Sequence, residues 1–169
     1  ITFNTPLAYL VSSGPGGSGI AIGDLNKDGK PDIAVATGIT TASDSIAVLQ
    51  NLNTTSGAAF NAGSFASYVN YYSGNAIEGL CMGDIDGDGF DDIVCSNNNN
   101  NNISVFRNTS IAGGAISFAA KVTSGTGINP LNISLGDVNA DGKLDIAVAN
   151  NATSGGISII QNNSTPGVI

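Results

Sequence analysis

A short acidic stretch occurs three times in this chain, and each copy is followed by an apolar run. The copies read GDLNKDGKPDIAVAT from Gly23, GDIDGDGFDDIVCSN from Gly83 and GDVNADGKLDIAVAN from Gly136. Their first aspartates are Asp24, Asp84 and Asp137, so the intervals are 60 and 53 residues. Self-similarity at a period near fifty is typical of propellers and solenoids rather than of a single irregular domain.

The apolar runs around each acidic stretch predict β-strands, because they are short, rich in β-branched residues and bounded by turn residues. In each copy one run ends at the Gly-Asp pair, a second follows the acidic stretch, and a third lies beyond a polar loop. The predicted strands are 20–23, 33–36 and 46–49, then 80–83, 93–96 and 103–106, then 133–136, 146–149 and 157–160.

A fourth strand is expected to open each unit. The candidates are ITF at 1–3, AAF at 58–60 and ISF at 116–118, whose phenylalanines Phe3, Phe60 and Phe118 lie 57 and 58 residues apart. Four antiparallel strands are the content of one propeller blade. The sequence therefore predicts an all-β chain of three tandem four-stranded antiparallel propeller-blade units that together form one repeat-array domain. The expected units are residues 1–57, 58–114 and 115–169.

Each acidic stretch places oxygen-bearing side chains at positions 1, 3, 5 and 9, with glycine at position 6 and a main-chain carbonyl available at position 7. Such a set wraps a hard cation, and calcium accepts six to eight oxygen ligands. The predicted side-chain ligands are Asp24, Asn26, Asp28 and Asp32, then Asp84, Asp86, Asp88 and Asp92, then Asp137, Asn139, Asp141 and Asp145. The predicted carbonyl ligands are those of Lys30, Phe90 and Lys143. We expect about three Ca²⁺, one per repeat.

Zinc and copper are not expected, because the sequence has no His and both cysteines lie outside the acidic stretches. The stretches begin like an EF-hand loop, but position 12 of that motif is a bidentate Glu. Here position 12 is Val35, Cys95 or Val148, each inside a predicted strand. The sequence therefore predicts calcium-binding β-hairpin loops that the residue at position 9 closes.

The pattern D-x-[DN]-x-D-G-x-x-D, followed by an apolar strand and repeated once per unit, resembles the FG-GAP or VCBS repeat of integrin-α-like β-propellers. The resemblance covers all three units. It implies calcium at positions 1, 3, 5 and 9 with the main-chain carbonyl at position 7, which are the residues chosen above on chemical grounds. Family propellers usually close with about seven blades, whereas three units are found here.

The charge of the chain is acidic and sparse. Charged residues make up 11% of the sequence, and the net charge is −8. An acidic surface argues against nucleic acids and anionic membranes as partners, and no apolar run of about 18 residues predicts a membrane span.

Ten of the thirteen acidic residues are predicted ligands, so three Ca²⁺ would bring the net charge to −2. Because clustered carboxylates repel one another, calcium is expected to stabilise the fold.

The two cysteines flank the second acidic stretch symmetrically. Cys81 precedes Asp84 by three residues, and Cys95 follows Asp92 by three residues. This placement allows a cross-strand disulfide, which would fit an exported protein. Small or apolar residues stand at the matching positions of the other two copies, so two buried thiols are the alternative.

Asparagine is abundant, and the run at 97–102 is expected in a hairpin loop because Asn tolerates turn conformations. N-x-[ST] sequons mark candidate N-glycosylation sites. They occur at Asn53, Asn102, Asn108, Asn132, Asn151, Asn162 and Asn163. An Asn-rich surface without glycans is the alternative.

Catalysis is not expected. The sequence has no His, one Arg and no nucleophile elbow, and nearly all carboxylates belong to the predicted metal loops. A polysaccharide lyase would need a base and cationic groups, and the chain has five Lys and Arg in all. The expected function is therefore non-enzymatic.

Two functions remain. Three blades do not easily close a ring, and stacked units leave an unpaired face and edge at each end. The sequence begins and ends at a predicted unit boundary without a polar capping repeat, so we expect an extracellular structural subunit that self-associates into an oligomer or surface filament. The alternative is an adhesion or glycan-binding module of a larger secreted or surface protein, with Tyr68, Tyr71 and Tyr72 as a sugar platform. A core or interface role is the alternative for these three tyrosines. Concentration-dependent polymerisation separates the two functions.

Overall fold

The computed structural model describes residues 2, 4–11, 18–38, 44–55, 57, 59–153 and 155–169. Over these residues the chain forms 11 strands in three antiparallel sheets and one short 3-10 helix. No helix in this part of the chain is long and apolar enough to cross a membrane. The prediction of an all-β chain is confirmed.

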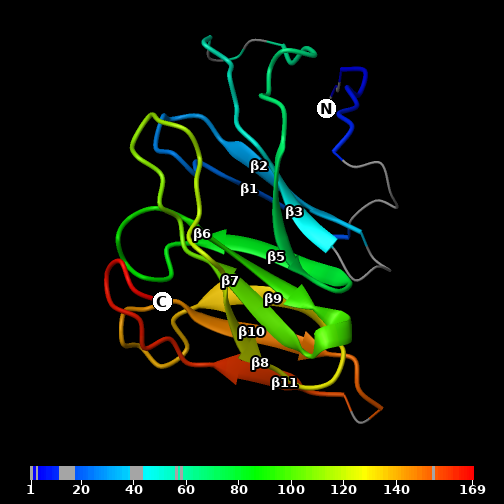
Figure 1. The fold of residues 1–169 in the computed structure, drawn as a ribbon, viewed down its shortest axis with the longest axis vertical. Coiled ribbons are helices and arrows are strands. Elements are labelled where there is room, and N and C mark those ends of the chain that lie inside the picture. The colour runs from blue at the N-terminus through cyan, green and yellow to red at the C-terminus, as the bar shows by residue number, and fades with distance from the viewer. Residues whose placement is uncertain are drawn as a thin grey trace.

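The three sheets repeat one topology, and each begins with the strand that precedes an acidic loop. Sheet 1 has the spatial order β1 (Ile20–Gly23), β2 (Asp32–Thr37), β3 (Asp44–Leu49) and β4 (Val69–Gly74). Sheet 2 has the order β5 (Ile77–Gly83), β6 (Asp92–Asn97), β7 (Asn102–Phe106) and β8 (Val122–Gly125). Sheet 3 contains β9 (Pro130–Gly136), β10 (Asp145–Asn150) and β11 (Ile157–Ile160). Figure 1 shows the sheets one after another down the molecule.

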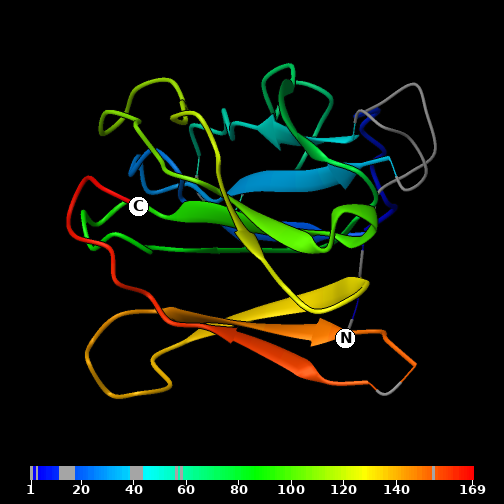
Figure 2. The same ribbon diagram turned by 60° about the horizontal axis from the view of Figure 1, so that its bottom comes forward.

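The sheets stack face to face, and their first strands β1, β5 and β9 lie side by side. Figure 2 shows the stack from another direction, with sheet 3 as its lowest layer. The first strands approach so closely that glycine is required at the contact. A Cβ on Gly79 would lie 2.5 Å from the carbonyl oxygen of Leu131, and one on Gly19 would lie 2.9 Å from the Cβ of Leu80. The result is an open stack, and the described residues do not close a propeller ring.

We name the two faces of each sheet by their neighbours in the stack. The leading face points toward the preceding sheet, and the trailing face points toward the following one. Between sheets 1 and 2, the trailing residues Ala34, Ile46 and Val48 pack with the leading residues Ile93 and Phe106. Between sheets 2 and 3, trailing Val94, Ile103 and Val105 pack with leading Ile146 and Val148. Two apolar cores of the same design therefore hold the three sheets together.

All nine strands predicted beside the acidic loops are confirmed, but the predicted opening strands are wrong where the structure describes them. Residues 59–60 and 116–118 are not strands, and residues 1–3 lie largely outside the described part of the chain. The fourth strand is instead β4 or β8, which starts four residues after an aromatic ring. Phe65 and Phe118 make equivalent single bridges to Asn51 and Asn108.

Phe65, not Phe60, is therefore the counterpart of Phe118 in the repeat. Period counting chose Phe60 because it lies near the mean spacing, but its side chain is 62% exposed. Each outer strand belongs to the sheet before the acidic loop that follows it, so sheet 1 extends to Gly74. The unit boundaries at 57/58 and 114/115 stay a prediction about the sequence repeat.

The asparagine run and the cysteines both lie in sheet 2. A 3-10 turn at Asn98–Asn100 joins β6 to β7, and Asn101 takes a left-handed φ of 52°, as expected for an asparagine hairpin. Both cysteines are free thiols. The register pairs Cys81 with Val94 and Cys95 with Leu80, so the two thiols point to opposite faces of the sheet. Two separate thiols, the alternative to the disulfide, are what the structure contains.

Candidate calcium-binding loops

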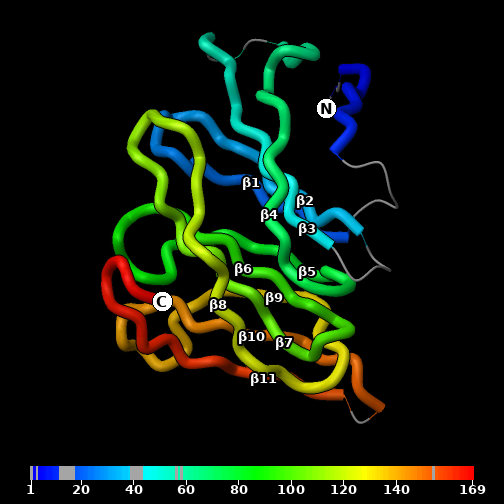
Figure 3. Tube along the Cα trace, viewed as in Figure 1, coloured from blue at the N-terminus to red at the C-terminus, as the bar shows by residue number. Residues whose placement is uncertain are grey.

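The three acidic loops join the first and second strands of each sheet. They lie at the same end of the strands, on the left side of the molecule in Figure 3, one loop per sheet. Loop 1 spans residues 24–32, loop 2 spans 84–92 and loop 3 spans 137–145. Because the flanking strands pair in the same register, each loop begins and ends at equivalent points, from Gly23 opposite Asp32 to Gly136 opposite Asp145.

The aspartate at position 1 organises each loop by accepting backbone hydrogen bonds across the turn. Its Oδ2 accepts the N–H of the glycine at position 6 at 2.8 Å in loops 1 and 2 and 2.9 Å in loop 3. The carboxylate at position 5 accepts the N–H of position 7 at 3.0, 2.8 and 2.9 Å in the same order. These bonds orient the oxygens toward the interior of the loop.

Two residues per loop adopt the left-handed backbone conformation. The glycine at position 6 has φ of 82°, 93° and 86° in Gly29, Gly89 and Gly142. Position 4 has φ of 55° in Lys27 and 63° in Ala140, which is costly for residues with a Cβ. The strain at position 4 was not visible in the sequence, because only loop 2 has glycine there.

The aspartate at position 9 ties the loop to the sheet. Asp32 accepts the N–H of Leu25 at 2.9 Å and that of Asn51 at 2.8 Å. Asp92 and Asp145 make the same pair of bonds in their own sheets. Each oxygen accepts one backbone N–H and retains a second lone pair for a cation. The position that closes the predicted site therefore also fixes the loop to the end of the third strand.

Loop 2 brings three carboxylates into one cluster. Oxygen atoms of Asp84, Asp86 and Asp88 all lie within 4.8 Å of one another. Oδ1 of Asp84 is buried without a hydrogen-bond partner, as is Oδ1 of Asn26 at position 3 of loop 1. A buried oxygen without a donor is costly, and a hard cation bound by oxygens would satisfy it. The residues present therefore fit Ca²⁺, which would supply positive charge to the cluster.

The electrostatics of loop 2 also fit a cation. Burial raises the pKa of Asp92 to about 7, and although the N–H groups of Asn108 and Ile85 oppose the rise, the charges of Asp86 and Asp88 add to it. Burial likewise raises the pKa of Asp32. In loop 1 burial would raise the pKa of Asp28, but its bonds and charge contact with Lys30 lower it overall. The Lys30 ammonium lies 3.0 Å from Asp28 Oδ2 and so supplies part of the positive charge that a cation would supply.

One arrangement of asparagine side chains occurs twice in the chain and links consecutive loops. Nδ2 of Asn108 donates to the carbonyls of Asp91, in loop 2, and of Leu25, in loop 1. Nδ2 of Asn162 donates to Leu144, in loop 3, and Ile85, in loop 2. Sequence reasoning missed this clamp, although the signal was present as the repeated Gln-Asn or Arg-Asn pair after the third strand of each unit.

The asparagine clamp makes two of the predicted glycosylation sites unsuitable for a glycan. Asn108 and Asn162 are buried, and both donate their amide to two carbonyls, so a glycan at either would break the links between loops. Asn132, Asn151 and Asn163 are exposed, while Asn53 and Asn102 are partly buried. Glycosylation of the exposed positions stays a prediction.

Loops 1 and 2 are covered by chain from the following sheet, whereas loop 3 is open. The N–H of Gly113 donates to the Asn26 carbonyl at 2.7 Å, and the N–H of Gly167 donates to Asp86 Oδ2 at 2.9 Å. Consequently Asn26 and Asp86 are buried while their counterpart Asn139 is exposed. The cover is supplied by residues that follow the third strand of the next sheet.

Comparison with known families agrees with these loops. A model of the FG-GAP repeat matches residues 16–48, and a model of the FG-GAP-like repeat matches residues 84–148. The chain contains FG-GAP repeats. The two matched ranges include all three acidic loops, and in each match an acidic loop is followed by the second strand of a sheet. A search of curated proteins finds no match to the chain.

The tyrosines of the expected sugar platform do not form one surface in this FG-GAP repeat protein. The ring of Tyr71 packs into the core, with ring centroids 4.9 Å from Phe118 and 6.4 Å from Phe106. Tyr68 and Tyr72 are exposed, and the Lys121 ammonium lies 4.6 Å from the centre of the Tyr72 ring. Tyr71 therefore has the core role that was the alternative for these residues.

Proposed function

We propose that this chain is a non-enzymatic, calcium-stabilised extracellular structural protein whose copies associate end to end. In this proposal the trailing face of sheet 3 in one copy packs on the leading face of sheet 1 in the next. Because the two faces belong to opposite ends of the stack, the contact is heterologous and generates a ring or a filament.

The observation that carries the proposal is the exposure of sheet 3 at positions that are buried in the other sheets. By strand register, Ile157 corresponds to Ile46 and Ile103, and both of those side chains are fully buried. Ile157 is 73% exposed, and Ile159, the counterpart of Val48, is 48% exposed. An exposed apolar face with the pattern of two internal contacts is typical of an interaction surface.

The opposite end of the stack has the complementary face. Ile20 and Ile22 of β1 are 62% and 66% exposed. Their counterparts Leu80 and Met82 in sheet 2 pack against the core between sheets 1 and 2. Each copy therefore carries both halves of the contact that it makes twice within its own stack.

The glycines that end the first strands, just before the acidic loops, support the same pairing of the two ends of the stack. A Cβ on Gly23 would lie 3.0 Å from Met82 Sδ, and one on Gly83 would lie 2.8 Å from Leu135, because the following sheet covers both. Nothing lies within 4 Å of the corresponding point above Gly136. Ile22 is the counterpart of Met82 and Leu135 in the strand register. The exposed Ile22 of a second copy would therefore fill the space above Gly136 of the first.

The proposed contact between copies differs at one residue from the contacts inside the stack. Asn132 stands where Gly19 and Gly79 allow the first strands to approach closely. A side chain at that point keeps the β9 of one copy apart from the β1 of the next. The contact between copies therefore depends more on the outer strands than the contacts inside the stack do.

Calcium has a structural role in the proposal. The side-chain geometry of loop 2 and the buried, unpartnered oxygens of Asp84 and Asn26 support it. Without a cation, the carboxylates of each loop repel one another, and the asparagine clamps transmit the strain to the next loop. Binding to the folded chain stabilises it by mass action.

The test combines assembly and stability in one experiment. We expect purified chain to sediment as polymers in calcium and to show a lower thermal midpoint and fewer polymers in chelator. An Ile157→Asp and Ile159→Asp double variant should remain monomeric with its calcium-dependent midpoint retained. Ile128→Asp, at another exposed apolar residue, is the matched control and should polymerise normally.

Each half of the proposal has its own contradicting result. Equal thermal midpoints in saturating calcium and in chelator would exclude the structural metal. A monomeric chain at high concentration in calcium would exclude end-to-end association and favour the alternative, an adhesion or glycan-binding module. That alternative is supported by the FG-GAP matches and by the exposed Tyr72 beside Lys121.

A further inference from the structure

The outer edge of sheet 3 differs from the outer edges of sheets 1 and 2. β4 closes the edge beside β3, and β8 closes the edge beside β7. In the part of the chain that the structure describes, β11 pairs only with β10. An open edge presents backbone N–H and C=O groups that can pair with another strand.

A groove of about 350 Å³ lies between sheets 2 and 3 next to this edge, with Val105, Val122 and Ile160 among its lining residues. The corresponding place between sheets 1 and 2 is filled by the rings of Tyr71, Phe106 and Phe118. By register, Ser124 and Ile160 replace Tyr71 and Phe106. The third ring, that of Phe118, has no counterpart at sheet 3 in the described residues.

The stretch ahead of β1 is similar in sequence to the stretches that supply the outer strand and its phenylalanine in sheets 1 and 2. Each outer strand follows a phenylalanine by four residues, as in Phe65 with Val69 and Phe118 with Val122. The stretch ahead of β1 reads FNTPLAY, and its residues Phe3, Leu7 and Tyr9 align with Phe65, Val69 and Tyr71. Phe3 lies outside the described residues, whereas residues 4–11 are described and form no strand.

We propose that residues 4–11 of one copy form the outer strand of sheet 3 in a second copy, by antiparallel addition to β11. The inference rests on the proposed end-to-end association and specifies how it is made. The pairs Val48 with Val69 and Ile46 with Tyr71 fix the register. Leu7 then lies opposite Ile159 of the second copy, and Tyr9 lies opposite Ile157.

Chain connectivity favours a second copy as the recipient. β4 completes sheet 1 and leads directly into β5 of sheet 2, and β8 completes sheet 2 and leads into β9 of sheet 3. The N-terminal segment leads into β1, so the sheet it completes must precede sheet 1 in the stack. Donation to sheet 3 of a second copy joins the same two faces that the proposed function brings together.

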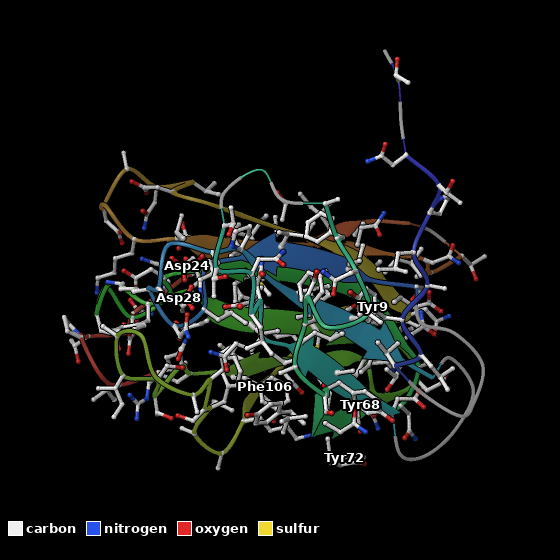
Figure 4. All side chains as sticks on the ribbon, turned by 90° about the horizontal axis from the view of Figure 1, so that it is seen from above. Tyr9, Asp24, Asp28, Tyr68, Tyr72 and Phe106 are labelled. Carbon is white, nitrogen blue, oxygen red and sulfur yellow. The ribbon has the colours of Figure 1, made fainter. Side chains whose placement is uncertain are left out.

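The N-terminal segment is held only lightly in the isolated chain. Tyr9 makes an edge contact with Phe65 at 5.3 Å between ring centroids, and its hydroxyl donates to the Asn61 carbonyl. Leu7 and Leu10 are 46% and 84% exposed. In Figure 4 the segment projects from the molecule on the side away from Asp24 and Asp28. Its release from sheet 1 therefore costs few contacts.

Disulfide trapping between full-length chains tests the register. Chains with Leu7→Cys are mixed with chains with Ile159→Cys in calcium and oxidised, and we expect a cross-linked heterodimer. Leu7→Cys mixed with Ser158→Cys is the matched control, because a one-residue slip turns the side chains to opposite faces. The native thiols interfere little, since burial raises the pKa of Cys81 to about 12 and that of Cys95 to about 11.

Sedimentation of the same mixtures separates the two proposals. Polymers without the Leu7–Ile159 cross-link, or with equal cross-linking in the control, would overturn the strand exchange while leaving end-to-end association intact. Monomers in every mixture would overturn both. A Leu7→Asp and Tyr9→Asp double variant should raise the concentration needed for assembly by more than about tenfold, and Leu10→Asp should change it by less than about twofold. Equal effects of the two variants would contradict the inferred face of the strand.

Discussion

Ile46 in sheet 1 and Ile157 in sheet 3 occupy the same position of the repeat but have opposite environments. Ile46 is fully buried in the contact with sheet 2, whereas Ile157 is 73% exposed. The same contrast separates Leu25, at 0%, from Val138, at 62%, at position 2 of their loops. Local sequence is therefore equivalent at the two sites, and only the presence of a following sheet decides which side chain is buried.

The largest effect that separates the two environments is expected from truncation. Ile46→Ala should lower the free energy of unfolding by about 3 kcal/mol, because it leaves a cavity in a packed core. Ile157→Ala should change the stability of dilute, monomeric chain by about 0.5 kcal/mol or less, because its side chain is in water. Urea unfolding in calcium measures both, and equal losses would show that sheet 3 is covered within one chain.

The three acidic loops offer a second comparison. Loop 2 has four predicted ligand carboxylates, whereas loops 1 and 3 have three each. Because affinity follows ligand charge, loop 2 should bind Ca²⁺ about tenfold more tightly than loop 3. The variants Asp24→Ala with Asp137→Ala and Asp24→Ala with Asp84→Ala leave one loop each for calorimetric titration. A loop 3 that bound Ca²⁺ as tightly as loop 2, or more tightly, would contradict this prediction.

The smallest expected difference concerns the asparagine clamps. Asn51 donates its Nδ2 to the Pro31 carbonyl, whereas Asn108 donates to Asp91 and also to Leu25 of the preceding loop. Asn108→Ala should therefore cost about 1 kcal/mol more than Asn51→Ala in monomeric chain, the value of one further buried hydrogen bond. In the polymer, Asn51 would gain a second hydrogen bond if it contacts loop 3 of a neighbouring copy. The difference in lost stability between the two variants should then become smaller. If this difference is the same in polymer and monomer, Asn51 does not bond to loop 3 of a neighbouring copy.

The strands beside the loops were predictable because their signals are local. Ile33–Ala36 and Ile93–Ser96 are short β-branched runs between turn residues, and their register follows from the hairpin that each acidic loop closes. The outer strands β4 and β8 were missed because VNYYSG and VTSG lack a strong apolar alternation. They form strands because an edge next to β3 or β7 is available, which is a long-range condition.

The acidic loops were also predictable from sequence, because the oxygen-bearing side chains, their spacing and the glycine at position 6 all lie within nine residues. The double role of Asp32, Asp92 and Asp145 was not predictable, since their second hydrogen bond reaches Asn51, Asn108 or Asn162, which follow the next strand of the sheet. The symmetric spacing of Cys81 and Cys95 did not reveal their orientation, because only the strand register places the two thiols on opposite faces of the sheet.

The sequence by itself determined the repeat, its all-β character and the position of each acidic loop, because these depend on residues within one hairpin. Only the tertiary structure decided to which sheet each outer strand belongs and which thiols and asparagines are buried. It also decided that the leading face of sheet 1 and the trailing face of sheet 3 are exposed. Those properties depend on the stacking of one sheet on the next. Stacking buries Ile46 and leaves Ile157 in water although their strands match, because burial belongs to a pair of surfaces and not to a sequence.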